Sequence, residues 1–194
     1  MYGFDDKTSE GKSFIKVTPK TAISTGRFIK DIRFVPAKDG ANAYLEIEVR
    51  DVNNATASRR YYEPKIDERI KDEKALEAAQ KKINAVAKNL TTKFLGEDYK
   101  ITGVKTFEEF CNKIITDIKK TPGWDKKELR IKVVLNANGY PTLPSYSPIF
   151  ELATVPLEQS ILAINPRFDV VEGAEPDEDT KPDISKEELD SAAF

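Results

Sequence analysis

Apolar and polar residues alternate along three short stretches in the N-terminal third of the chain. These stretches are residues 28–35, 44–50 and 56–62. In the second stretch Leu45, Ile47 and Val49 occupy every other position, so all three point to one face of a strand. The intervening residues 38–40 and 53–54 contain Asp-Gly and Asn-Asn, which are typical of turns. The pattern predicts a meander of three antiparallel strands.

Two helices are predicted after the third strand, in an insertion that spans about residues 67–120. Between residues 67 and 95 apolar residues recur at steps of three and four, which is typical of one helix face, and Gly96 is a suitable stop. Thr106 and Glu109 have the spacing of a capping box, so a second helix should begin there. Its apolar periodicity continues until a Pro-Gly pair ends it.

Strand character returns after the helices. Along residues 128–135 apolar side chains take one face, whereas Arg130 and Lys132 take the other and are expected to face outward. Residues 149–152 and 160–164 are further short strand candidates. This order predicts a mainly β, α+β fold: an OB-fold-like antiparallel β-barrel with two helices inserted after the third strand. A β-sandwich or an open α+β sheet would fit the same pattern.

The charges are distributed unevenly along the 194 residues. Residues 1–168 carry 29 basic and 23 acidic side chains, a net charge of +6, whereas residues 169–194 carry two basic and ten acidic ones, a net charge of -8. Beyond residue 168 glycine, proline and acidic residues dominate and apolar periodicity is lost, which predicts disorder. We therefore expect one folded domain, residues 1–168, that attracts polyanions, and an acidic tail, residues 169–194, that competes with them.

The residue types that are missing argue against an enzyme. The chain has no histidine and one cysteine, Cys111, which excludes histidine-based nucleophile systems and histidine-ligated metals. No glycine-rich phosphate loop is present. We expect no catalytic residue, no metal site and no cofactor. No apolar run approaches the roughly 20 residues of a membrane helix, no secretion signal is visible and Cys111 suits a reducing compartment, so we expect a cytoplasmic location.

Four consecutive residues combine the two kinds of side chain that bind single-stranded nucleic acid. On a strand Arg59 shares one face with Tyr61, and Arg60 shares the other face with Tyr62. Each face then offers a guanidinium for phosphate and a ring for a base. Stacking of a base on an aromatic ring contributes about 1–3 kcal/mol and tolerates any base. The alternative is that one face packs in the core and the other is merely solvated.

Basic and aromatic residues recur on the other predicted strands and would form one electropositive groove if these strands are neighbours. Outward-facing Arg50, Arg130 and Lys132 are the cations that would converge. Tyr140 and Tyr146 lie in a proline-stiffened loop that suits a nucleotide clamp, with packing as the equal alternative. The candidate nucleic-acid-binding residues are Arg27, Lys30, Arg33, Tyr44, Arg50, Arg59, Arg60, Tyr61, Tyr62, Arg130, Lys132, Tyr140 and Tyr146.

The last residues combine acidic side chains with a terminal aromatic ring. Glu187, Glu188 and Asp190 precede Phe194, which presents its ring and the terminal carboxylate together. Such a peptide can place the ring in an apolar pocket while a basic rim holds the carboxylates. We expect these four residues to bind a partner, and a purely solubilising tail is the alternative.

In this layout the chain resembles the single-stranded-DNA-binding proteins of tailed bacteriophages, which have an OB-fold body and an acidic C-terminal tail with a terminal aromatic. The resemblance rests on the meander of residues 28–62, the strand at 130–134 with its Asn-Gly-Tyr turn, and the tail to Phe194. It implies sequence-independent binding of single-stranded DNA in replication and recombination, in the host cytoplasm. It also implies that the tail recruits polymerase and primase-helicase, and occupies the DNA groove when no strand is bound.

Two other functions fit the sequence. A virion or assembly protein with a β-sandwich body would form a stable oligomer without DNA affinity. A magnesium-dependent nuclease would need only a few carboxylates brought together in space. As partners we expect single-stranded DNA, replication proteins and, as an option, further copies of the chain in a homo-oligomer, but no membrane.

Overall fold

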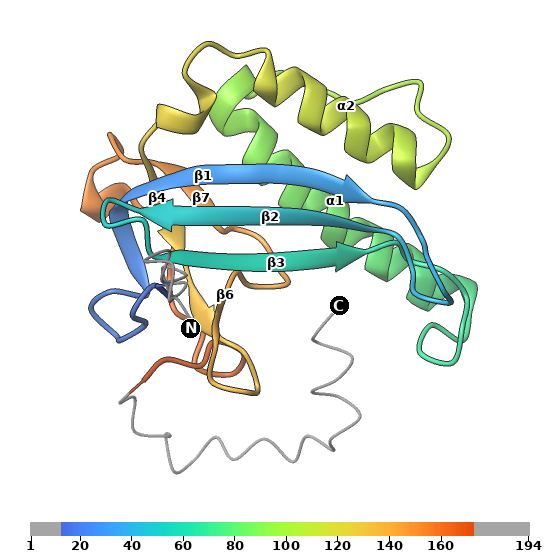
Figure 1. Cartoon of the computed structure of the whole chain (residues 1–194), viewed down its shortest axis with the longest axis horizontal. Coiled ribbons are helices and arrows are strands. Elements are labelled where there is room, and N and C mark those ends of the chain that lie inside the picture. The colour runs from blue at the N-terminus through green and yellow to red at the C-terminus, as the bar shows by residue number, and fades with distance from the viewer. Residues whose placement is uncertain (1–12, 173–194) are drawn as a thin grey trace, which may run out of the picture.

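The computed structural model describes residues 13–172, which form a mixed α+β fold (Figure 1). The elements are β1 (Ile23–Val35), β2 (Tyr44–Asp51), β3 (Thr56–Tyr62), α1 (Glu73–Leu95), α2 (Phe107–Lys119), the 3-10 turn η1 (Trp124–Lys126), β4 (Leu129–Lys132), β5 (Val134–Leu135), β6 (Pro141–Thr142), β7 (Phe150–Leu152) and the 3-10 turn η2 (Leu157–Gln159). One antiparallel sheet has the strand order β3-β2-β1-β4-β7, and β5 pairs with β6. In Figure 1, α1 passes behind the three long strands and α2 lies beside β1.

The structure confirms the meander of three strands and the two helices that follow it. β3 has the predicted bounds, and β1 begins five residues earlier than predicted. α1 begins at Glu73 because Asp67 binds the backbone of a preceding turn and Asp72 caps the helix through a 2.7 Å bond to a first-turn N–H. The capping box of Thr106 and Glu109 forms as predicted. The start of α2 was therefore predicted correctly, whereas α1 begins six residues later than residue 67.

The core lies between the sheet and the helices. Leu45, Ile47 and Val49 are fully buried and belong to one apolar cluster, as their alternation predicted. Leu90 of α1 and Ile114 of α2 are buried in the same cluster. Burial of an aliphatic side chain of this size stabilises a fold by about 1.5–3 kcal/mol. One face of β2 is thus committed to packing, which leaves the opposite face of the strand for other roles.

The five-stranded sheet does not close into the barrel expected from the sequence. β3 and β7 are its two edges. Side chains connect β3 to the segment around β6: the Thr142 hydroxyl donates to the Ser58 carbonyl at 2.8 Å, and the Tyr61 hydroxyl donates to the Pro144 carbonyl at 2.9 Å. These contacts are made by side chains, and no backbone pairing joins β3 to β6 within the described residues. Alternation determines which face of a strand is buried but says nothing about which strands pair, so the pattern left this point open.

The strand predicted at residues 160–164 does not form. Glu151 of β7 binds this segment with its side chain, accepting from the N–H of Ile161 at 2.9 Å and from the hydroxyl of Ser160 at 2.9 Å. Because the Glu151 carboxylate already accepts a hydrogen bond from the Ile161 N–H, this N–H does not require a carbonyl on a neighbouring strand. The segment is therefore irregular, although its sequence is apolar.

The folded body extends past the predicted boundary at residue 168. Asp169 is 6% exposed and Val171 is 7% exposed. The N–H of Leu135 donates to the Val170 carbonyl at 2.8 Å, and the N–H of Glu172 donates to the Val17 carbonyl at 3.0 Å. The predicted boundary was wrong because it was drawn from the distribution of charged residues along the sequence, which placed Asp169 in the acidic tail. Within residues 13–172 no helix has the length and apolarity needed to span a membrane.

Candidate nucleic-acid interface

The face of β1, β2 and β3 that points away from the buried cluster carries most of the basic and aromatic residues of these strands. Paired residues share a face, and Tyr44 pairs with Tyr62 while Glu46 pairs with both Arg60 and Arg33. We call this surface the open face. Its residues are Phe28, Lys30, Asp31, Arg33, Val35, Tyr44, Glu46, Glu48, Arg50, Thr56, Ser58, Arg60 and Tyr62.

One end of the open face is aromatic. The rings of Tyr44 and Tyr62 lie 5.3 Å apart at 58°, and both side chains are only partly buried. The Arg60 guanidinium lies 5.0 Å from the centre of the Tyr44 ring. An aromatic pair with a cation on its surface is a suitable platform for a nucleobase followed by a phosphate.

Two arginines share one carboxylate in the next row. Glu46 is 7% exposed at its side chain and bonds Arg33 and Arg60, which remain 54% and 53% exposed. The hydrogen bond to Glu46 raises the pKa of Arg33, and hydrogen bonds to Tyr62 and Glu46 raise the pKa of Arg60. Both guanidiniums therefore stay charged. A guanidinium has five N–H donors, so each arginine keeps donors that can reach an external phosphate.

Two further cations continue toward the other end. Lys30 pairs with Glu48 at 3.0 Å, and Arg50 lies over the Phe28 ring at 4.7 Å. The open face thus combines four cations with three carboxylates, Asp31, Glu46 and Glu48. Its charge is modestly positive and its cations are held in position by neighbours. Such an arrangement suits a polyanion that binds across several rows rather than at one point.

Arg130 does not face solvent, so the prediction of an outward-facing residue was wrong. Its side chain is 6% exposed and forms an ion pair with Glu151, which is 4% exposed. Its second nitrogen, Nη2, donates to the Val155 carbonyl at 2.9 Å. Hydrogen bonds from Ile161, Ser160 and Arg130 outweigh the effect of burial and lower the pKa of Glu151. The Arg130 side chain is therefore occupied by contacts within the fold.

Lys132 is also buried, again against the prediction. Its Nζ lies 3.0 Å from the Asp169 carboxylate and 3.1 Å from both the Tyr146 hydroxyl and the Ala163 carbonyl. Tyr146 in turn donates to Asp169 at 2.6 Å. The segment around residues 163–169 covers this part of the sheet. Tyr146 is therefore held by Lys132 and Asp169, and a clamp formed by Tyr140 and Tyr146 stays a prediction.

Three more candidates lie on the core side. Arg27 is 3% exposed and donates to the Ala22 carbonyl at 2.9 Å, and burial lowers its pKa to about 10. Tyr61 is 1% exposed, and burial raises its pKa. Arg59 donates to the Leu143 carbonyl at 3.0 Å, and burial lowers its pKa. The alternation Arg59-Arg60-Tyr61-Tyr62 thus resolves into one packing face and one open face.

Six of the predicted residues are brought together and the rest are not. The six on the open face are Lys30, Arg33, Tyr44, Arg50, Arg60 and Tyr62. Tyr140 is 57% exposed and lies in the turn between β5 and β6. The tail residues Glu187, Glu188, Asp190 and Phe194 lie outside the described residues. Sequence reasoning missed Phe28 and Glu46, since the strand pattern marks them only as one apolar and one acidic side chain.

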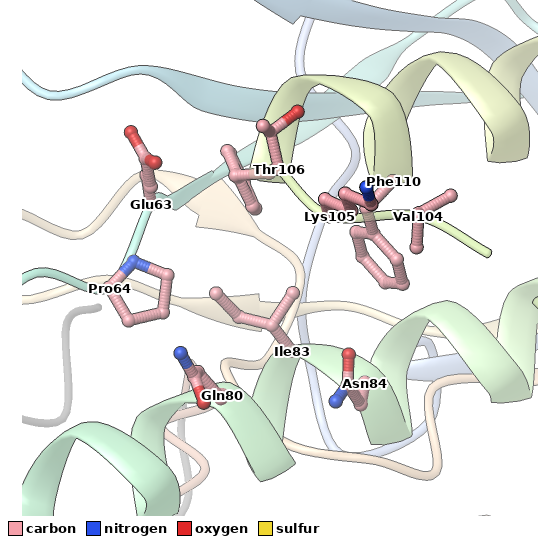
Figure 2. Close-up of a pocket in the computed structure, with 10 residues that line it drawn as sticks. Glu63, Pro64, Gln80, Ile83, Asn84, Val104, Lys105, Thr106 and Phe110 are labelled. Atoms are coloured by element: carbon pink, nitrogen blue, oxygen red, sulfur yellow. The ribbon is translucent and has the colours of Figure 1, made fainter. Parts of the chain in front are cut away.

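A separate pocket of about 480 Å³ lies between the two helices (Figure 2). Ile83 of α1 and Phe110 of α2 point into it, and Glu63 and Pro64 close it beyond the end of β3. The pocket is on the helix side of the sheet. It is therefore distinct from the open face.

Two features of the described part of the chain concern metal binding and thiol reactivity. Within residues 13–172 no group of three or more His, Cys, Asp or Glu side chains could hold a metal ion. Cys111 is fully buried, and burial raises the pKa of its thiol to about 12. A buried thiol with such a pKa is a poor nucleophile at neutral pH.

Comparison with known proteins identifies no family for this chain. The sequence matches no protein-family model, and the search of curated proteins found no match. The candidate interface therefore depends on the register of β1, β2 and β3, which brings Tyr44, Tyr62, Arg33 and Arg60 onto one accessible surface.

Proposed function

We propose that this protein binds single-stranded DNA, independently of its sequence, through the open face. The observation that carries the proposal is the row structure of that face: an aromatic pair, Tyr44 and Tyr62, adjoins the half-exposed arginines Arg33 and Arg60. Aromatic rings stack on any base and guanidiniums bind any phosphate, so neither contact depends on base identity. Both arginines are held on Glu46, which limits the entropy that they lose on binding.

We further propose that the fold is a variant of the OB-fold. Support comes from the order of three antiparallel strands, two helices and returning strands, and from the side-chain bonds of β3 to residues 142–144. In an OB-fold the outer surface around the second and third strands binds oligonucleotides. The open face occupies the corresponding strands, β2 and β3.

The acidic tail has two roles in this proposal. Residues 173–194 carry acidic side chains and end in Phe194, so they can compete with DNA for the cations of the open face and can bind replication proteins such as a polymerase or a primase-helicase. The protein would then act in DNA replication and recombination, in the cytoplasm of a phage-infected host. This part is carried by charge and by the resemblance described above.

The test is a salt-titrated binding assay of the full chain on fluorescent oligo-dT. We expect nanomolar to micromolar affinity, with log K falling against log salt by about 0.7 per phosphate neutralised, hence by no more than about 3 for four cations. Tyr62→Leu should weaken binding about tenfold, whereas Tyr62→Phe keeps the ring and should bind like the parent protein.

Three outcomes would overturn the proposal. The first is an absence of binding at low salt. The second is a Tyr62→Leu variant that binds as well as the parent. The third is metal-dependent degradation of the oligonucleotide, which would favour a nuclease. If the first outcome is accompanied by a stable large oligomer on gel filtration, an assembly protein is favoured instead.

A further inference from the structure

The end of the open face opposite Tyr44 and Tyr62 is extended by an additional segment. Residue Phe14 forms a parallel bridge with Thr56: the N–H of Thr56 donates to the Ser13 carbonyl at 2.8 Å, and the N–H of Ile15 donates to the Thr56 carbonyl at 3.2 Å. Ile15 is 3% exposed and anchors the segment in the core. Since neighbours on a strand point to opposite faces, Phe14 lies on the side of the open face. It continues the row that Thr56 forms with Arg50.

Phe14 meets a second exposed ring there. Its ring and that of Tyr140 lie 6.0 Å apart at 56°, and the two residues are 52% and 57% exposed. Tyr140 is held by its turn, in which the Asn136 side chain accepts from the N–H of Tyr140 at 2.9 Å and Gly139 supplies a φ of 77°. Two large rings that a rigid backbone keeps half in water mark a binding surface rather than a packing contact.

We propose that Phe14 and Tyr140 form a second base-stacking subsite for the same single strand. This inference rests on the proposed function. Tyr62 and Thr56 are six residues apart on β3, which corresponds to about 20 Å along the strand. About six nucleotides at a stacked rise of roughly 3.4 Å cover that length, and an extended strand needs fewer. This span falls within the roughly 4–16 nucleotides bound by a single domain of this kind.

The surface between the two aromatic ends favours a nucleic acid over a protein partner. Four cations lie between them, Arg60, Arg33, Lys30 and Arg50, and they outnumber the three carboxylates Asp31, Glu46 and Glu48 by one. The side chains of Arg33 and Arg60 are 54% and 53% exposed. A strand stacked at both ends would run its phosphates over these cations. The two subsites thus explain each other's position: the rings hold the terminal bases, and the cations hold the backbone that joins them.

The experiment measures affinity against oligonucleotide length, from dT3 to dT16, for the full chain and a Phe14→Leu/Tyr140→Leu variant. We expect the parent's affinity to rise with length and to level off once both ends are reached. The variant should bind dT3 like the parent and bind dT12 about tenfold or more weakly. Leucine keeps the apolar bulk, so a purely structural role would tolerate it. Phe14→Tyr and Tyr140→Phe keep the rings and should behave like the parent.

Leu157→Ala serves as the control, because Leu157 is 76% exposed in η2, beyond the opposite edge of the sheet. Equal affinity of the parent and the Phe14→Leu/Tyr140→Leu variant for every length would overturn the second subsite while leaving the proposed function intact. Failure of the parent itself to bind would instead contradict the proposed function. A change in oligomeric state of the variant on gel filtration would assign the two rings to contacts between copies of the chain.

Discussion

Two lysine–carboxylate pairs in this sheet have the same distance and opposite surroundings. Lys30 and Glu48 lie 3.0 Å apart with side chains 46% and 20% exposed, and Lys132 and Asp169 lie 3.0 Å apart with side chains 2% and 0% exposed. The first pair belongs to the open face, and the second is covered by the segment around residues 163–169. The same kind of ion pair therefore lies on an accessible surface in one place and inside the folded core in the other.

The difference shows that a basic strand face is not by itself a binding face. Arg130 and Lys132 alternate with apolar residues just as Arg60 and Tyr62 alternate with core residues. An exposed ion pair contributes about 0–1 kcal/mol and leaves its cation available. A buried pair is strongly interdependent, because removal of one partner leaves an uncompensated charge in a medium of low dielectric constant. The predictions below test this contrast.

The largest effect is expected from the position of the C-terminal truncation. A chain that ends at Glu172 keeps Asp169 and Val171, whereas a chain that ends at Phe168 leaves Lys132 unpaired and opens the core at Val171. We expect the longer chain to be as stable as the full chain and the shorter one to lose more than about 4 kcal/mol in urea unfolding.

The truncation at Glu172 also tests the competition by the tail. It removes acidic residues without touching the buried pair, so binding to oligo-dT should become tighter, most clearly at low salt. An unchanged affinity would contradict competition between the tail and DNA.

Removal of one lysine from each pair compares them directly. Lys132→Met should lower the free energy of unfolding by about 3–5 kcal/mol, because the buried Asp169 carboxylate would lose its cationic partner. Lys30→Met should lower it by less than about 1 kcal/mol, since Glu48 is reached by water. Urea unfolding followed by fluorescence measures both. Equal losses would show that exposure does not govern these pairs.

A smaller effect is expected for DNA binding by Arg60→Ala. The Glu46 carboxylate keeps Arg33 as its partner, so stability should change by less than about 1 kcal/mol. Affinity for oligo-dT should fall several-fold and the salt slope should decrease by about 0.7, as expected for the loss of one phosphate contact. Lys74→Ala, at the exposed start of α1, is the matched control and should leave both quantities unchanged.

The smallest effect concerns acid stability. The pKa of Glu151 is lowered in the folded protein relative to its ordinary value of 4.5. Its contribution to stability is therefore present above pH 4.5 and is lost as the pH falls through the folded-state value. Wild-type stability should fall as the pH drops below about 4.5, and Glu151→Gln should show a shallower fall from a lower starting stability. Identical pH profiles would contradict a charged Glu151 in the folded state.

The elements that depend on neighbouring residues were readable from the sequence. The capping box of Thr106 and Glu109, the stop at Gly96 and the buried alternation of Leu45, Ile47 and Val49 all follow from contacts within a few positions. Part of the candidate interface was readable for the same reason. Arg60 and Tyr62 share a face because the strand period is two.

Only the tertiary structure decided which of the two faces is open and which charges are paired. Lys132 and Asp169 are 37 residues apart, Arg130 and Glu151 are 21 apart, and Phe14 reaches the open face through Thr56. Local periodicity specifies the direction of a side chain, but burial depends on which distant segment covers it. A charge count assigned Asp169 to the tail, whereas the desolvated Nζ of Lys132 requires that carboxylate as its partner inside the fold.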